Sequence, residues 1–278
     1  MPYKLDLGKL FSDTFELYKR NLGTMCLVVL ILMIIPMIFG PAGSVMTFIT
    51  QMTVRQGGDD TLFAMLIAGQ VCLQILQTIL QWYIVLGILR QCLYIARGQT
   101  DLRMNLLSSP FSLYLKYVGF ALAFGGIQFC VMLPTIIPIS IGAAMGTFSQ
   151  SFDDPVVIGL FVAGGCLALP CYCFLIWLTT RLCLAVFFIV DQNESIANAI
   201  IYSWRVSSGN FWLIFIAQFV LGICAVLGMF LCCVGIILTG AIAVFGQALI
   251  YLQLTGQPNG LDFGYNDKAL EGYIPAEE

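Results

Sequence analysis

The sequence contains no histidine and few charged residues, and both shortages narrow what the protein can do. Its 278 residues include 12 lysines and arginines and 15 aspartates and glutamates, so that only 10% are charged. Without histidine, the chain lacks the usual ligand of haem, copper and catalytic zinc and the commonest general base of enzymes. The net charge of -3 argues against the basic surface that nucleic acid requires. We therefore expect no catalytic residue, no cofactor, no metal site and no nucleic-acid partner.

Hydrophobic residues take the place of the missing charge and make up 60% of the chain. They form runs of at least about twenty residues, each long enough to cross the hydrocarbon core of a membrane. The fold class predicted is all-α: a polytopic membrane helix bundle of about six transmembrane helices with short amphipathic surface helices. The six predicted spans are residues 22–39, 61–97, 110–141, 155–190, 211–231 and 236–254. Residues 1–256 then form one transmembrane domain, and 257–278 form a polar, acidic C-terminal tail.

Proline, glycine and paired aspartates predict where these spans end. Gly40-Pro41 is expected to end the first span, with a connector over 42–60, and a linker is expected over 142–154. Pro134 and Pro138 are expected to kink or break the third span, and Cys232 to Gly235 to form a tight connector. Asp59-Asp60 and Asp153-Asp154 resemble paired catalytic carboxylates, but each pair lies where a helix cap belongs, and capping is the favoured interpretation.

The 11 cysteines do not change this picture. Most lie within apolar runs, as expected of small buried hydrophobic residues. Cys171 and Cys173, like Cys232 and Cys233, are too closely spaced for a two-pair zinc site.

The basic residues predict the orientation of the bundle in the membrane. If six spans alternate in direction, only Arg55 of the 12 basic residues falls on the far side of the membrane. Because positive charge is retained on the cytoplasmic side, both termini are expected in the cytoplasm. The predicted location is the bacterial inner membrane.

The stretch from Asp191 to Phe211 is the clearest polar interruption in the second half of the chain. Asp191 and Glu194 have the spacing of a capping box, and Gly209 can end a helix in a left-handed conformation. Ile196, Ile200 and Trp204 recur at four-residue spacing. The pattern predicts an interfacial amphipathic helix near 192–208, with those three side chains against the membrane interface or the cytoplasmic mouth of the bundle; the alternative is a polar loop. A similar helix is predicted near 6–20.

Two sets of polar residues lie within the predicted spans. Gln70, Gln74, Gln77 and Gln81 fall within about 60° of one another on a helical wheel. Because four amides facing lipid are costly, they should serve interhelical hydrogen bonds, a polar solute path or a contact with a partner subunit. Arg90 and Arg181 lie two to three turns inside their helices. Their side chains can reach the interface by snorkelling, or bind a lipid phosphate.

Several segments together resemble a known family. They are DLGKLFSDTFELYKRNLG at the N-terminus and the segment from Pro170 to Phe211, in which Arg181, Asp191, Ser203-Trp204 and Gly209-Asn210 are the most specific residues. The chain resembles, over about residues 6–257, the membrane domain fused to some bacterial glycerophosphodiester phosphodiesterases and found in related six-helix membrane proteins of unknown function. It departs from the family where Cys171 replaces the usual glycine after proline. The catalytic barrel of those enzymes is absent, so the resemblance implies no enzyme activity.

These observations predict a non-catalytic inner-membrane protein that acts as a structural or accessory subunit of a membrane complex. Its partners are expected to be membrane lipids and a protein partner or a second copy of the chain. A small-solute or lipid transporter is the alternative, although no carboxylate for ion coupling lies within a predicted span. An integral-membrane enzyme comes third.

Overall fold

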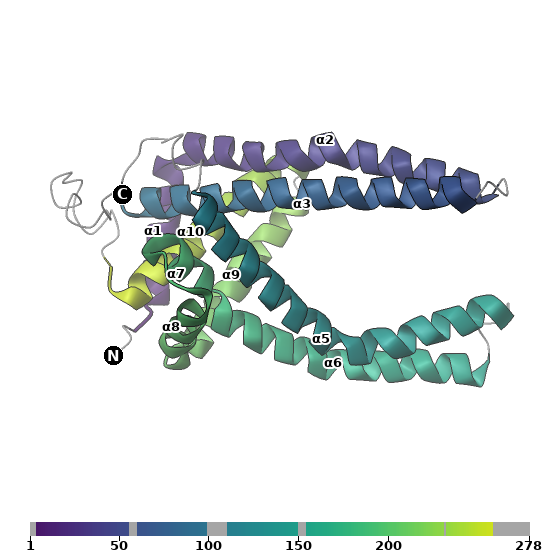
Figure 1. Ribbon diagram of the computed structural model, residues 1–278. Coiled ribbons are helices and arrows are strands. Elements are labelled where there is room, and N and C mark those ends of the chain that lie inside the picture. Colours follow the sequence, from purple (N-terminus) through teal and green to yellow (C-terminus); the bar gives the residue numbers. More distant parts are fainter. Residues whose placement is uncertain (1–3, 56–59, 99–109, 150–153, 231, 258–278) are drawn as a thin grey trace.

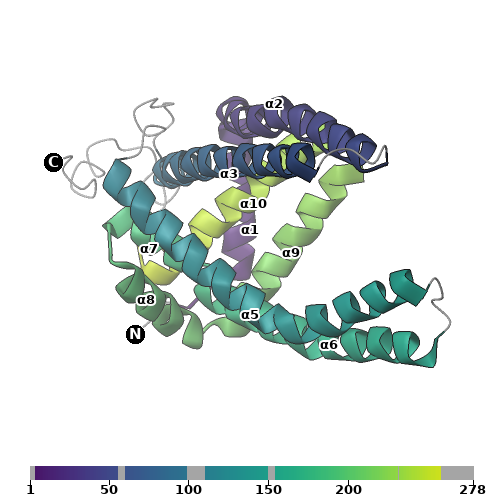
Figure 2. The ribbon, with the colours of Figure 1, turned by 45° about the vertical axis from the view of Figure 1, so that its right-hand side comes forward.

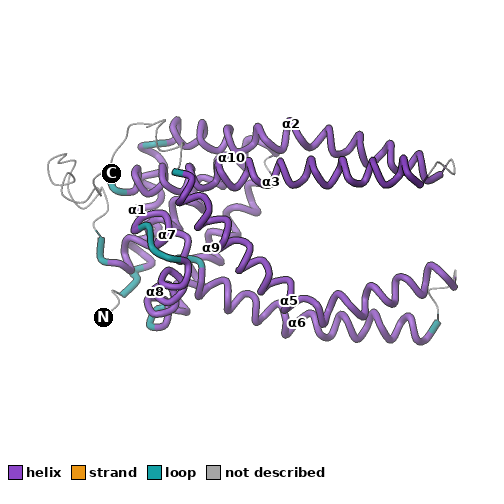
Figure 3. The backbone as a smooth tube through the Cα atoms, in the orientation of Figure 1, coloured by secondary structure: helices purple, strands orange, loops and turns teal. Residues whose placement is uncertain are grey.

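The computed structural model describes residues 4–55, 60–98, 110–149, 154–230 and 232–257. Within these ranges all the regular structure is helical (Figure 3). The helices are α1 (Leu7–Arg20), α2 (Leu22–Arg55), α3 (Asp60–Ala96), α5 (Phe111–Ser149), α6 (Pro155–Leu182), α7 (Ala185–Gln192), α8 (Ile196–Ser208), α9 (Phe211–Phe230) and α10 (Cys232–Thr255). The predicted C-terminal tail, apart from Gln257, lies outside the described residues.

Among the described residues, four helical segments are long and apolar enough to cross a membrane, so the protein is membrane-embedded. They are Thr61–Ala96, Phe111–Gly146, Pro155–Gln192 and Phe211–Gly228. Helices α2 and α3 form one long hairpin and α5 and α6 form another, and the two hairpins diverge from a common end (Figures 1 and 2). The short helices α1, α7 and α8 gather at that common end.

Three predicted connectors are helical instead. Cys232 to Gly235 form the first turn of α10, so the prediction of a tight connector there was wrong. Helix α2 continues through Gly40-Pro41 to Arg55, and α5 continues past Gly142 to Ser149. A break in the hydrocarbon core exposes unpaired backbone groups, which costs more than the one hydrogen bond that a proline removes. The predictions that 42–60 and 142–154 are connectors were therefore wrong over most of their length.

The prolines of α5 bend the helix without ending it. Pro134 and Pro138 both lie inside α5. The helix changes direction along its length and then follows α6 (Figure 1). Proline removes a backbone hydrogen bond and crowds the preceding turn, which explains a change of direction within a continuous helix.

The fourth predicted span is divided into two helices. Helix α6 ends at Leu182, a short turn follows, and α7 then runs from Ala185 to Gln192. Asn193 ends α7 in the left-handed region, with φ 51°. Lys116 on α5 holds this turn by donating to the Asn193 backbone and side-chain oxygens at 2.6 and 2.8 Å.

The buried core lies at the common end of the hairpins. Its largest members include Leu10, Phe187, Tyr251 and Phe245, from α1, α7 and α10. Away from this end, large apolar side chains such as Met65 on α3 and Leu169 on α6 are exposed. In a membrane such side chains face lipid, so the core only has to hold the helices together where they converge.

Helix α1 fastens the N-terminus to this core. Asp6 is its N-cap and accepts hydrogen bonds from the amides of Gly8 and Lys9 at 2.9 and 3.2 Å. The amide of Leu5 donates to Asn210 Oδ1 at 3.3 Å, which joins the start of the chain to the start of α9. Helix α1 begins one residue after the start of the amphipathic helix predicted near 6–20 and ends at the same residue.

Candidate functional site

Helix α8 forms within the polar stretch, but its caps differ from those predicted. Ser195 is the N-cap, and its side chain accepts from the Asn198 amide at 3.3 Å. Asp191 belongs to the end of α7, so its predicted role as the cap was wrong. Gly209 has φ −87°, so the predicted left-handed ending was also wrong. A left-handed residue does occur nearby, at Asn193, where it separates α7 from α8.

The face of α8 that is buried in the protein is made of small residues. Ala199, Ser203 and Ser207 are buried, whereas Ile196 and Ile200 are half-buried and Trp204 is 40% exposed. Small side chains let two backbones approach closely, which explains why this face, rather than the Ile196–Ile200–Trp204 face, is turned inward.

Ser203 and Ser207 join α8 to the end of α6. The Ser203 hydroxyl donates to the backbone oxygen of Arg181 at 2.7 Å, and the Ser207 hydroxyl reaches the same oxygen at 3.4 Å. Because the last carbonyls of a helix have no partner within it, these hydroxyls satisfy a group that α6 leaves open. The contact holds the next residue, Trp204, beside the Arg181 side chain.

Three aromatic rings surround the Arg181 guanidinium, and we call this group the Arg181 cage. The guanidinium carbon lies 5.9 Å from the ring centre of Trp177, 5.4 Å from that of Trp204 and 5.3 Å from that of Phe211. Trp177 and Trp204 also meet edge to face, with centres 5.2 Å apart. The negative faces of aromatic rings stabilise a cation, so α6, α8 and α9 jointly provide a site for one positive charge.

The Arg181 cage leaves hydrogen-bond donors unused. Arg181 Nε and Nη1 are buried and have no hydrogen-bond partner among the described residues. Nor does Arg181 take part in an ion pair within the described part of the chain. A buried donor without an acceptor costs about 1–3 kcal/mol, and more when it is charged. Such an arrangement leaves a place for an acceptor from outside the described residues.

A groove of about 670 Å³ lies between α6 and α9, next to the Arg181 cage. Its lining is mostly apolar and comes from one face of each helix. The lining residues are Tyr172, Leu175, Ile176, Thr179 and Thr180 from α6, and Phe215, Gln218, Phe219, Gly222, Ile223, Val226 and Leu227 from α9.

The groove and the Arg181 cage share a wall. Phe215 lines the groove and stacks on Phe211, a member of the cage, with ring centres 6.4 Å apart. Thr180 lines the groove and directly precedes Arg181. The guanidinium therefore lies just beyond that end of the groove which is nearer to α8. About one aromatic ring separates it from the groove.

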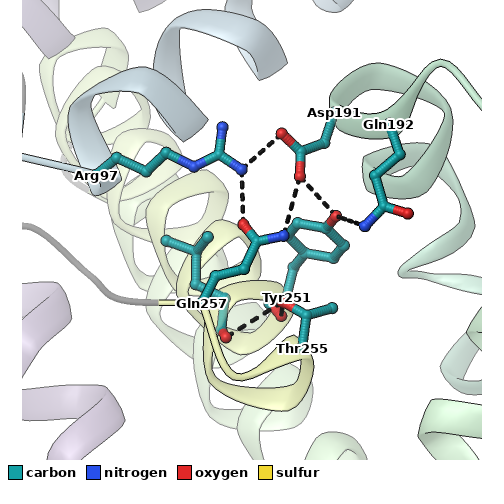
Figure 4. A network of polar contacts seen from close by, with 7 residues as sticks. Arg97, Asp191, Gln192, Tyr251, Thr255 and Gln257 are labelled. Atoms are coloured by element: carbon teal, nitrogen blue, oxygen red, sulfur yellow. Dashed lines mark hydrogen bonds and ion pairs between the residues drawn. The ribbon is translucent and has the colours of Figure 1, made fainter. Parts of the chain in front are cut away.

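A second polar group lies at the converging ends of α3, α7 and α10 (Figure 4). Arg97 Nη2 donates to Asp191 Oδ1 at 2.6 Å and to Gln257 Oε1 at 2.6 Å. The Tyr251 hydroxyl donates to Asp191 Oδ2 at 2.7 Å, and Gln257 Nε2 contacts the same oxygen at 3.3 Å. Gln192 in turn donates to the Tyr251 hydroxyl at 3.3 Å. We call this group the Arg97–Asp191 network.

The remaining predicted residues are distributed along α3. Gln70 donates to Thr47 Oγ1 on α2 at 2.9 Å, a hydrogen bond between neighbouring helices. Gln74 is exposed, and Gln77, Gln81 and Arg90 are half-buried. Arg90 lies on α3, far along the chain from the cage and groove residues of α6, α8 and α9, and does not belong to the Arg181 cage.

Within the described ranges, no group of three or more cysteine, aspartate or glutamate residues could hold a metal ion. Asp154 caps α6, accepting from the Val156 amide at 2.9 Å, as expected. Asp59 and Asp153 lie outside the described residues. What the site offers is one caged cation beside an apolar groove, an arrangement suited to binding rather than to proton transfer.

Comparisons with protein-family models, with curated proteins and with solved structures find no match to this chain. The resemblance to the phosphodiesterase-associated membrane domain therefore stays a prediction.

Proposed function

We propose that the protein is a non-catalytic integral membrane protein that holds a membrane lipid in the groove between α6 and α9. The observation that carries this proposal is the groove itself, whose volume of about 670 Å³ lies within the usual range for ligand sites. Most of its lining is aliphatic or aromatic. Such a lining matches acyl chains better than a polar solute.

The position of the groove also favours lipid. Its walls belong to two of the helical segments that are long and apolar enough to cross a membrane. Along α9 the lining extends from Phe215 to Leu227, which is about 18 Å at 1.5 Å per residue. One leaflet of a hydrocarbon core is about 15 Å deep, half of the usual 30 Å. The groove is therefore matched to a lipid of a single leaflet.

This match favours a protein that binds lipid as an accessory subunit of a membrane complex over a protein that transports lipid. A transporter carries its substrate through both leaflets and needs a path along the full depth of the membrane. Lipid transport is the second candidate, because the same groove would be the start of such a path. Protein partners in the proposed complex are a different membrane protein or a second copy of the chain.

The proposed topology has six spans, with both termini in the cytoplasm of a bacterium and the bundle in its inner membrane. Helices α2 and α10 supply the two spans beyond the four long apolar segments, on the strength of their apolar sequences. The arrangement in Figure 1 supports this proposal, because α1, α7 and α8 share one end while α2 and α5 end at the other. Most of the basic residues then lie with α1, α7 and α8, as the positive-inside rule requires.

Single-cysteine labelling tests the topology. In a variant without the native cysteines, a membrane-impermeant maleimide should label Arg55→Cys and Asp153→Cys in intact cells. Arg103→Cys and Arg205→Cys should react only after the membrane is permeabilised, and Lys19→Cys serves as the cytoplasmic control. Labelling of Arg103→Cys or Arg205→Cys in intact cells would contradict the six-span proposal.

Filling the groove tests lipid binding. Gly222 lines the groove, and a Cβ atom added there meets nothing within 4 Å, so Gly222→Trp should occupy the groove without disturbing α9. We expect crosslinking of a phospholipid with a photoreactive acyl chain to α6 and α9 to fall about tenfold. A tenfold loss corresponds to about 1.4 kcal/mol, roughly two displaced methylene groups.

Gly165→Trp is the matched control, because Gly165 is an exposed position on α6 with equally open space and lies outside the groove lining. Its crosslinking should equal that of the unchanged protein. Equal crosslinking in Gly222→Trp and the unchanged protein would show that the groove does not hold the lipid.

A further inference from the structure

We propose that Arg181 binds the phosphate group of a phospholipid whose acyl chains lie in the α6–α9 groove, an inference that rests on the proposed lipid-binding function. The inference specifies the chemical class of the ligand. It is a lipid with a phosphate on its glycerol group, and it lies in the leaflet on the α8 side of the membrane. The inference is carried by the Arg181 cage and by its place at the end of the groove.

The geometry of a guanidinium separates two kinds of interaction. Its flat faces attract aromatic rings, while its N–H groups point outward in the plane and need acceptors. Trp177, Trp204 and Phe211 supply rings at 5.3–5.9 Å, which stabilises the charge. The buried Nε and Nη1 groups still have no acceptor within the described residues. The cage therefore explains why a cation is tolerated there, and leaves its donors available.

A phosphate is the acceptor that fits these donors. Phosphate oxygens form short, charge-assisted hydrogen bonds with arginine, and the pairing neutralises the caged charge. A lipid phosphate also lies at the right depth, because the groove takes the acyl chains and ends about one ring from the guanidinium. A phospholipid bound in this way satisfies the apolar groove and the arginine together.

Trp204 lies on the side of the Arg181 cage from which a lipid headgroup would approach. It is the exposed ring of the three, at 40%, whereas Trp177 and Phe211 are half-buried. Its backbone is fixed because the neighbouring Ser203 donates to the Arg181 carbonyl at 2.7 Å. A headgroup would reach the donors once the indole turned away from the guanidinium and from Trp177, with α8 staying in place.

The leaflet follows from the position of α8. Helices α1, α7 and α8 share one end of the molecule, and in the proposed topology that end is cytoplasmic (Figure 1). The phosphate bound by Arg181 then belongs to the cytoplasmic leaflet. Arginine near this boundary is well placed for lipid phosphates.

Two lipids that differ only in the phosphate test the inference. The full-length protein in a neutral detergent is titrated with phosphatidic acid and with diacylglycerol of identical acyl chains, and bound lipid is counted by native mass spectrometry. We expect phosphatidic acid to bind at least about tenfold more tightly, the effect of one charge-assisted contact. In Arg181→Gln this preference should disappear, while diacylglycerol binding stays the same.

Arg205→Gln is the matched control, because Arg205 is an exposed arginine in the last turn of α8 and lies outside the Arg181 cage. It should keep the preference for phosphatidic acid. Arg181→Lys keeps the charge without the planar donors and should show an intermediate preference. It also keeps the test decisive if Arg181→Gln does not fold, because a preference in Arg181→Lys as large as that of the unchanged protein would overturn the inference.

The outcomes separate the two proposals. If neither lipid binds the unchanged protein, the proposed lipid-binding function is wrong. If phosphatidic acid and diacylglycerol bind equally, or if Arg181→Gln keeps the preference, the groove holds lipid but Arg181 does not bind the phosphate. If inorganic phosphate alone displaces phosphatidic acid at millimolar concentration, the site binds free phosphate, and the lipid assignment is overturned.

Discussion

Replacing Asp191 with alanine is expected to lower the free energy of unfolding by about 3–5 kcal/mol, the usual effect of removing one partner from a buried ion pair. The Asp191 side chain is 6% exposed and that of its partner Arg97 is 18% exposed. Without the carboxylate, the Tyr251 hydroxyl loses its acceptor and Arg97 keeps only the neutral Gln257 oxygen as an acceptor, where little water reaches either group. Thermal unfolding in detergent, followed by circular dichroism, measures the change.

Two comparisons make this expectation specific. Asp154→Ala removes a helix cap on α6 and should cost only about 1 kcal/mol. The double variant Arg97→Met with Asp191→Leu removes both charges and should recover most of the loss, because a buried pair contributes little beyond an apolar pair of similar size. If Asp191→Ala unfolds like Asp154→Ala, the Arg97–Asp191 network does not hold the ends of α3, α7 and α10 together.

Gly228→Ala is expected to destabilise the α9–α10 hairpin by about 3 kcal/mol, at the upper end for overpacking. A Cβ atom at Gly228 would lie 1.9 Å from Thr239 Oγ1 and 2.7 Å from the backbone oxygen of Gly235. A side chain can rotate away from the first contact, but the second involves backbone and requires the two helices to separate. Chemical denaturation in mixed micelles measures the loss.

Gly222→Ala is the control on the same helix, because a Cβ atom there meets nothing within 4 Å. It should leave stability unchanged or raise it by about 0.5–1 kcal/mol, since alanine favours helix more than glycine does. Thr239→Ala combined with Gly228→Ala should restore only part of the loss, because the Gly235 carbonyl remains in the way. Full recovery in the double variant would show that α9 and α10 are not in backbone contact at this point.

Local signals in the sequence predicted the helices better than their ends. The apolar runs identify the long helices because backbone groups in lipid must be satisfied within the chain. Gly40-Pro41 and the stretch after Gly142 were misread because glycine and proline end helices in water more reliably than in lipid. Asp191 has the sequence signature of a cap, but a carboxylate can serve equally well as an ion-pair partner, and only the approach of Arg97 decides between them.

The candidate site was only partly visible in the sequence. The lining residues of α6 and α9 recur at three- and four-residue spacing, so each stripe is present in the sequence. Both helices are apolar on all sides, however, and no contrast with polar residues shows which face meets a neighbour. Arg181 stood out as a cation within a span. Trp177 lies four residues before Arg181 on α6, a spacing that the sequence shows. Trp204 and Phe211 come from α8 and α9, so their approach to Arg181 follows from the packing of those helices and not from spacing along the chain.

The length of the two diverging hairpins makes the molecule sensitive to bilayer thickness. Helices α2, α3 and α5 have 34, 37 and 39 residues, or about 51–58 Å at 1.5 Å per residue. A hydrocarbon core of about 30 Å accommodates such lengths by tilting the helices or by thickening around them. Because the hairpins are joined at one end only, additional tilt moves their far ends apart. We therefore expect thin membranes to spread the hairpins and thick membranes to bring them together.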